Sequence, residues 1–216
     1  MSRVAAPWLG CQKKTLRASE QRRPDVAAER DDFSKEIAAG DPNRLVFLDE
    51  SGILTNMTRR TARAPIGERA CGEAPVNWKR LTVLGALGLD GVVTMTTVTT
   101  GTTIPVFLGF LQTTLLPVLR EQKPDAVVVM DNLSAHKNQA VKDAIAAAGL
   151  TLRYLPRYSP DFSPIEPCWS KIKTALRAVA ARTVESLRAA LDTVVADVTA
   201  DDAAGWFGHC GYVSAS

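Results

Sequence analysis

The chain is poor in the residues from which many enzymes build a site. It has only two histidines and four cysteines in 216 residues, and no two cysteines form a Cys-x-x-Cys pair. Such scattered cysteines argue against a zinc site and against a disulfide framework, so reduced, intracellular thiols are the expected state. The sequence also lacks the Gly-x-Ser-x-Gly motif and the phosphate-binding loop. Serine-hydrolase and nucleotide-hydrolase chemistries therefore lack their usual residues. The cysteines are Cys11, Cys71, Cys168 and Cys210.

No segment has the pattern of a secretion signal or of a membrane span. The opening residues MSRVAAPWLG contain no apolar run of signal-peptide length. Residues 91–119 carry no charge, but nine of them are Thr, and Gly101, Pro105 and Pro117 interrupt the run. A strand followed by a buried helix fits this composition better than a membrane helix. We expect a cytoplasmic protein without a membrane partner.

Basic charge is concentrated in three segments, although the net charge is only +3. Residues 1–23, 57–80 and 153–182 each contain six Lys or Arg against one or two acids, whereas residues 183–216 contain one Arg against five acids. Separate basic segments can converge on one surface that binds a polyanion. Ordinary solvated faces explain the same composition equally well.

The hydrophobic pattern predicts an α/β domain with a mixed sheet flanked by helices. Short apolar runs at 44–51 and 126–131 are expected to be buried strands, and 150–155 a further strand. Residues 81–100 predict a hairpin that turns at Asp90-Gly91. Helices are expected over 103–119, over 138–148, from about Ile165, and as a last helix capped by Thr183. Residues 13–40 predict an exposed, charged helical arm broken near Pro24, so we divide the chain into an arm (1–40) and a domain (41–216).

Two carboxylates are expected at the ends of buried strands. Asp49 and Asp131 each follow an apolar run, and open α/β sheets place their ligand crevices at the carboxyl ends of strands. A single aspartate at such a position is more often a turn former. Strand alternation points Glu50 to the face opposite Asp49, so we do not expect it in the same cluster.

A third carboxylate lies in a proline-rich loop. Four prolines fall within residues 156–167, around Glu166. Proline is tolerated at a helix start, so the loop is expected to lead into a helix with Ser170, Lys173 and Arg177 on the Glu166 side. The other side is expected to be core, formed by Ile165, Trp169, Ile172 and Leu176. A lone Glu at a helix start is usually a helix-dipole partner. Three carboxylates would repel one another in a dry crevice unless hard cations lay among their oxygens.

The segments around these carboxylates resemble the three motifs of DDE transposases. They read VFLDESG (46–52), VVVMDNLSAHK (127–137) and YLPRYSPDFSPIEPCWSKIK (154–173). The 34 residues between Asp131 and Glu166 are similar to the spacing in the bacterial insertion-sequence branch of the mariner-type superfamily. The resemblance also includes RAPIGER (63–69), NWKRLTVLGAL (77–87) and WFGHCGY (206–212).

This resemblance implies a ribonuclease H-like fold and a metal-dependent DNA transposase. Asp49 would bridge two Mg²⁺ (or Mn²⁺) ions, while Asp131 and Glu166 would each hold one. Water would hydrolyse DNA at the transposon end, and the freed 3′-hydroxyl would join to target DNA. Phosphates would be bound by a set of basic residues from two segments: Arg59, Arg60, Arg63, Arg69, Lys79, Lys171, Lys173 and Arg177.

The chain also departs from the family pattern. Arg157 replaces a proline and Ser163 an asparagine of the third motif, and there is no room for the helix-turn-helix modules that usually precede the catalytic domain. We therefore expect weak, unselective DNA binding and an upstream helix-turn-helix partner or fusion; a homodimer is compatible with this. His136 is left out of the site, because a surface position at a helix start is at least as good an interpretation. Two alternatives stay open: an inactive DNA-binding regulator and a stand-alone ribonuclease H-like nuclease.

Overall fold

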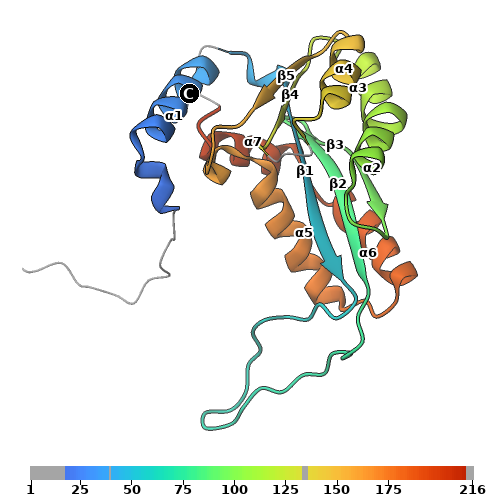
Figure 1. The fold of residues 1–216 in the computed structure, drawn as a ribbon. Coiled ribbons are helices and arrows are strands. Elements are labelled where there is room, and N and C mark those ends of the chain that lie inside the picture. Colours follow the sequence, from blue (N-terminus) through green and yellow to red (C-terminus); the bar gives the residue numbers. More distant parts are fainter. Residues whose placement is uncertain (1–17, 39, 133–135, 213–216) are drawn as a thin grey trace, which may run out of the picture.

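A mixed five-stranded sheet forms the centre of the protein (Figure 1). The computed structural model describes residues 18–38, 40–132 and 136–212, so the expectations for Cys11 and for the start of the arm lie outside the described residues. The strand order is β3-β2-β1-β4-β5. The first three strands pair antiparallel, whereas β4 pairs parallel with both β1 and β5. The strands are β1 (Leu45–Leu54), β2 (Arg80–Gly88), β3 (Gly91–Val98), β4 (Val127–Met130) and β5 (Thr151–Tyr154).

The strand that carries Asp49 is longer than predicted. We expected β1 to end at Asp49 and Glu50, but it continues to Leu54 because β2 pairs with it as far as Leu54↔Arg80. The parallel partner β4 pairs only with Leu45 to Leu48. Asp49 is therefore the first residue beyond the parallel pairing, and Asp131 follows the β4 residue that is opposite Leu48. This register places the two aspartates next to each other at one edge of the pairing.

Helices cover both faces of the sheet and form two separate cores. On one face, α2, a π-helical turn, α3 and α4 pack against residues such as Leu48 and Leu84. On the other face, α5, α6 and α7 pack against residues such as Phe47 and Val83. Alternation along β1 thus supplies both layers. These elements are α2 (Ile104–Phe110), the π-turn (Leu111–Leu115), α3 (Leu116–Gln122), α4 (Gln139–Ala147), α5 (Ile165–Val179), α6 (Val184–Ala196) and α7 (Ala200–His209).

The C-terminal segment contains two helices where one was predicted. Thr183 caps α6 as expected, and its side chain accepts a hydrogen bond from the Ser186 N–H. A second capping box at Thr199 and Asp202 then starts α7. Each capping box satisfies two backbone N–H groups at its helix start, which offsets part of the cost of the break. All four predicted core residues of α5 are buried: Ile165, Trp169, Ile172 and Leu176.

The N-terminal arm is a helix that packs on the domain. A 3₁₀ turn (Ser19–Arg22) precedes α1 (Pro24–Ala38), so the predicted break at Pro24 is where the helix begins. Most of α1 is exposed as expected, but Val26 is fully buried and Phe33 contacts the ring of Phe162. The arm therefore has an apolar contact with the loop that leads to α5. A second 3₁₀ turn (Pro42–Arg44) connects this region to β1.

The segment between β1 and β2 is a long exposed loop that extends away from the sheet (Figure 1). Arg182 holds its base, since its guanidinium donates to the carbonyls of Thr55 and Met57. Thr55 and Lys79 also exchange hydrogen bonds across the two ends of the loop. Across the described part of the chain, no helix is both long enough and apolar enough to cross a bilayer.

Candidate active site

The structure brings the three predicted carboxylates to one cavity. Asp49 comes from β1, Asp131 from the residue after β4, and Glu166 from the first turn of α5, and all three line a cavity of about 370 Å³. The loop between β5 and α5 forms another wall of this cavity. Elements that lie far apart in the sequence thus converge at one place, as predicted from two strand ends and a helix start.

Asp49 is the most shielded of the three. Burial raises the pKa of its carboxyl to about 6, and the charges of Glu166 and Asp131 act in the same direction. Hydrogen bonds from the Glu50 N–H and the Trp169 indole offset part of this effect. A carboxylate in this position gains from any nearby cation, because a cation removes the repulsion that makes ionisation costly.

Trp169 holds Asp49 in place, a role that sequence analysis missed. We expected Trp169 only in the core, and it is buried there, but its indole Nε1 also donates to Asp49 Oδ2 over 2.9 Å. Gly85 makes room for the ring. It pairs with Asp49 across the β1–β2 ladder, and a Cβ at this position would lie 2.7 Å from Trp169 Cη2. No periodic pattern distinguishes an indole that donates to a carboxylate from one that only packs.

Asp131 is held from the opposite face of the sheet. His136 Nδ1 lies 2.6 Å from Asp131 Oδ1, and His136 Nε2 lies 3.2 Å from Glu50 Oε1. Burial lowers the pKa of His136, but its bonds to the two carboxylates outweigh burial and raise that pKa to about 9. At neutral pH the imidazolium therefore donates to both. The ring stacks on Phe107 with centroids 4.6 Å apart.

Two expectations are wrong at this point. His136 is fully buried and lies before α4 begins, so it is not a surface residue at a helix start. Glu50 does point away from Asp49, as alternation predicts, but it takes part in the cluster through His136. Burial is set here by Phe107 on a distant helix, which a local pattern does not reveal. The spacing of five residues between Asp131 and His136 was the available signal.

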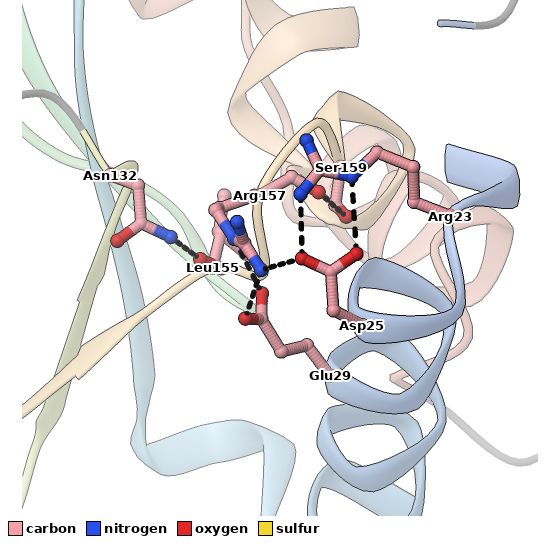
Figure 2. A network of polar contacts seen from close by, with 7 residues as sticks. All are labelled: Arg23, Asp25, Glu29, Asn132, Leu155, Arg157 and Ser159. Atoms are coloured by element: carbon pink, nitrogen blue, oxygen red, sulfur yellow. Dashed lines mark hydrogen bonds and ion pairs between the residues drawn. The ribbon is translucent and has the colours of Figure 1, made fainter. Parts of the chain in front are cut away.

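Glu166 is positioned by a stiff loop. The loop includes a 3₁₀ turn (Pro160–Phe162), and the Ser163 carbonyl accepts a hydrogen bond of 3.1 Å from the Glu166 N–H. Ser163 thus supplies a turn hydrogen bond through its backbone. Asn132, next to Asp131, donates to the Leu155 carbonyl at the start of the loop (Figure 2). This bond joins the second carboxylate segment to the third.

The predicted DNA-binding residues fall into three groups. Arg60, Lys173 and Arg177 lie close enough to affect one another: burial lowers the pKa of Lys173, and the charges of Arg177 and Arg60 add to this effect, against Glu166. Lys171 lies on another side of α5, where its ammonium contacts Asp202. The exposed loop between β1 and β2 carries the remaining four: Arg59, Arg63, Arg69 and Lys79.

The oxygen donors fit a magnesium or manganese site that is completed by its substrate. Among the described residues, no group of three His, Cys, Asp or Glu side chains forms a ready-made metal site. Mg²⁺ is usually held by one or two carboxylates together with water and substrate phosphate, rather than by a cage of protein ligands alone. The three carboxylates of the cavity, with the shielded Asp49 among them, match that kind of site.

Comparisons with known proteins agree with this geometry. A family model described as "DDE superfamily endonuclease" matches residues 44–188. Comparison with curated proteins gave no significant match. The Mos1 transposase in a paired-end complex with the left transposon end is 18% identical with a TM-score of 0.76, covering 94% of this chain and 64% of the Mos1 chain. This chain therefore spans less than two thirds of that transposase.

Structures of the Mos1 catalytic domain alone match over most of both chains. The catalytic domain of Mos1 mariner transposase is 15% identical with a TM-score of 0.66, covering 94% of this chain and 93% of the domain. The Mos1 catalytic domain with Raltegravir and Mg is also 15% identical, with a TM-score of 0.66 and coverages of 88% and 91%. The likeness at this identity is one of fold, and it confirms the predicted ribonuclease H-like mixed sheet flanked by helices.

Proposed function

The chain belongs to the DDE superfamily endonucleases, and on this premise we propose that it is a transposase catalytic domain that cleaves DNA at transposon ends and joins the freed 3′-hydroxyl to target DNA. The observation that carries the proposal is the convergence of Asp49, Asp131 and Glu166 on one cavity, with Lys173 close enough for the charges of Glu166 and Asp49 to act on it. Oxygen ligands for hard cations and counter-charges for phosphates are what phosphodiester transfer requires.

Each carboxylate has a distinct support in this proposal. Asp49 would be a ligand for two Mg²⁺ or Mn²⁺ ions, and the Trp169 indole would keep its carboxylate in position. Asp131 would hold one ion while His136 donates to one of its oxygens, and Glu166 would hold the other from the rigid start of α5. When bound, such ions stabilise the charge that develops on the attacking and leaving oxygens at phosphorus. Carboxylates that are already held by hydrogen bonds need little reorientation when a metal ion binds.

The basic residues would hold the DNA backbone. Lys173 lies close enough to Glu166 for their charges to interact and would contact phosphates nearest the scissile bond, and Arg60 and Arg177, close to Lys173, would contact phosphates further along. Arg59, Arg63, Arg69 and Lys79 would extend the contact along the exposed loop. Lys171 would contribute least, because Asp202 already neutralises its charge. Phosphate contacts provide affinity without sequence information. We therefore also propose that recognition of the transposon end requires a helix-turn-helix polypeptide. Both polypeptides would be encoded by an insertion sequence and would act in the bacterial cytoplasm.

The test is cleavage and joining by the purified chain. Supercoiled plasmid reports nicking, and a duplex with a recessed 3′-hydroxyl reports joining, each with Mg²⁺, with Mn²⁺ and with EDTA. We expect metal-dependent products that disappear in Asp49→Asn, Asp131→Asn and Glu166→Gln, while circular dichroism shows that the variants stay folded. Activity that survives in Asp131→Asn would refute the assignment. Metal and DNA binding without any product would instead favour the inactive regulator, and nicking without joining the stand-alone nuclease.

A further inference from the structure

Helix α1 contacts one side of the loop between β5 and α5. The other side of this loop lines the cavity that contains the three carboxylates. Arg157, Tyr158, Ser159 and Pro160 all line the cavity that contains the three carboxylates. The same loop, from Arg157 to Phe162, makes hydrogen bonds, ion pairs and ring contacts with α1 and the turn before it. The wall of the cavity is therefore held from outside by a helix of which no residue lines that cavity.

Arg157 is the first anchor (Figure 2). Its guanidinium donates through Nε to Glu29 Oε2 at 3.1 Å, and through Nη2 to Glu29 Oε1 at 2.6 Å and Asp25 Oδ2 at 2.8 Å. Asp25 is shared with Arg23, and its hydrogen bonds from Arg23 and Arg157 lower the pKa of Asp25 to about 2. Two acids one helical turn apart thus form a fork that matches one guanidinium, a geometry that favours arginine over lysine.

Arg30 is the second anchor, and in this pair the cation is on the helix and the carboxylate is on the loop. It donates to Ser159 Oγ at 2.7 Å and to both oxygens of Asp161 at 3.0 and 2.7 Å. Its guanidinium also lies 4.5 Å from the centre of the Phe162 ring. Gln21, in the preceding turn, donates to the Tyr158 carbonyl at 2.6 Å. Tyr158 has a positive φ of 56°, so this carbonyl bond fixes a backbone conformation that a tyrosine rarely adopts.

The anchored loop is continuous with Glu166. The Phe162 N–H donates to the Ser159 carbonyl, the Ser163 N–H to the Pro160 carbonyl, and the Glu166 N–H to the Ser163 carbonyl. Each of these bonds spans three residues, so the chain from the anchors to the carboxylate is a series of short turns with little freedom. A displacement of the loop at Asp161 is therefore passed on to the start of α5.

We infer that α1 is a clamp that positions Glu166, and that Arg157, Arg30, Asp25 and Glu29 are positioning residues for the metal-dependent reaction. This inference rests on the proposed function. When the clamp is closed, the loop holds Glu166 against the cavity that it shares with Asp49 and Asp131. When these contacts are broken, the loop becomes more mobile and Glu166 is no longer held in position, although no residue of the cavity has been substituted. Arg157 stands where the resembled transposase motif has proline, so the ion pair replaces stiffness of the backbone with a contact between two elements.

A charge-reversal pair tests the clamp from the side of the helix. Glu29→Lys places an ammonium where two of the hydrogen bonds from Arg157 end, and adding Arg157→Glu restores an ion pair of opposite sense while Asp25 keeps Arg23. Asp31→Lys is the matched control, because Asp31 is exposed on the same helix and its ion pair is with Lys35 of that helix. The readouts are amide hydrogen exchange at Phe162 and Ser163, affinity for Mn²⁺ alone, and plasmid nicking.

We expect exchange at Phe162 and Ser163 to be about tenfold faster in Glu29→Lys, and nicking to lose about tenfold or more in kcat with little change in KM. Mn²⁺ should bind more weakly to Glu29→Lys, and the double variant should recover the slow exchange, the quantity that does not depend on the charge of Arg157 at the cavity wall. Unchanged exchange in Glu29→Lys, an equal loss in Asp31→Lys, or no recovery of slow exchange in the double variant would overturn the inference. Should Glu29→Lys lose its fold, recovery in the double variant decides the matter. A wild-type chain without nicking would refute the proposed function alone, since exchange and Mn²⁺ affinity still test the clamp.

Discussion

Replacing Asp49 by asparagine should stabilise the metal-free protein while it abolishes catalysis. Asp49 is shielded from water and close to two further carboxylates, and its pKa is raised from 3.8 to about 6. The substitution removes the charge but keeps an oxygen that can accept the Trp169 indole hydrogen bond. The substitution therefore changes mainly the charge at this position, so it tests how much burial and repulsion from Glu166 and Asp131 destabilise the ionised Asp49.

The size and the pH dependence follow from the raised pKa. A folded-state pKa above the unfolded value means that the folded protein binds the proton more tightly, so this stabilisation is complete below about pH 3.8 and is lost as the pH rises through 6. A shift of about two units corresponds to roughly 3 kcal/mol at full loss. At pH 8 the asparagine variant avoids that loss. We expect it to exceed the wild type by about 1–3 kcal/mol in free energy of unfolding, and by much less at pH 4.5.

Urea unfolding in EDTA at pH 8 and pH 4.5, followed by circular dichroism, measures this difference. Asp192→Asn is the control, because Asp192 is exposed on α6, away from the cavity. Mn²⁺ should then raise the stability of the wild type more than that of Asp49→Asn, because the cation binds the charge that the variant lacks. A variant that is less stable than the wild type at pH 8, or whose gain is the same at both pH values, would refute the reasoning.

Three further perturbations address other parts of the site. Gly85→Ala should lower the free energy of unfolding by about 1–3 kcal/mol, because its Cβ would lie 2.7 Å from the Trp169 ring; urea unfolding that shows no loss would contradict the close packing. His136→Ala should weaken Mn²⁺ binding about tenfold, because Asp131, the proposed metal ligand, loses its hydrogen bond from the imidazole; unchanged affinity in a Mn²⁺ titration would show that this bond is dispensable. Lys173→Ala/Arg177→Ala should reduce the slope of log K against log[salt] for DNA binding by about 2, and an unchanged slope would show that these cations are only solvated.

Local pattern was enough to locate most elements and the three carboxylates of the cavity. The apolar runs, the Asp90-Gly91 turn and the Thr183 cap each have a cause within a few residues, and the structure confirms them. The three carboxylates could be brought together from sequence because strand ends and a helix start share one edge of a mixed sheet. The exact length of β1 could not be predicted from the sequence, because its second half depends on pairing with β2, which begins after a connection of 25 residues.

The supports of the carboxylates could not be predicted, because each depends on packing between distant elements. Glu50 was excluded by strand alternation, which is correct for direction but takes no account of a bridging imidazole from the loop after β4. Trp169 satisfies a helix-face pattern as core, and only the missing side chain of Gly85 lets its ring reach Asp49. The acids of α1 appeared to be a solvated face until the fold placed Arg157 opposite them.

Helix α5 carries Glu166 near its first residue and Lys173 and Arg177 further along the same side. At 1.5 Å per residue, the two cations lie about 10 and 16 Å along the axis from the carboxylate. One DNA strand rises about 3.4 Å per nucleotide, so a strand running beside α5 would meet them about three and five nucleotides from the phosphate nearest Glu166. The spacing of side chains along α5 would thus decide which phosphates the two cations meet, and inserting one residue between Glu166 and Lys173 would turn both cations about 100° around the axis, away from the Glu166 side.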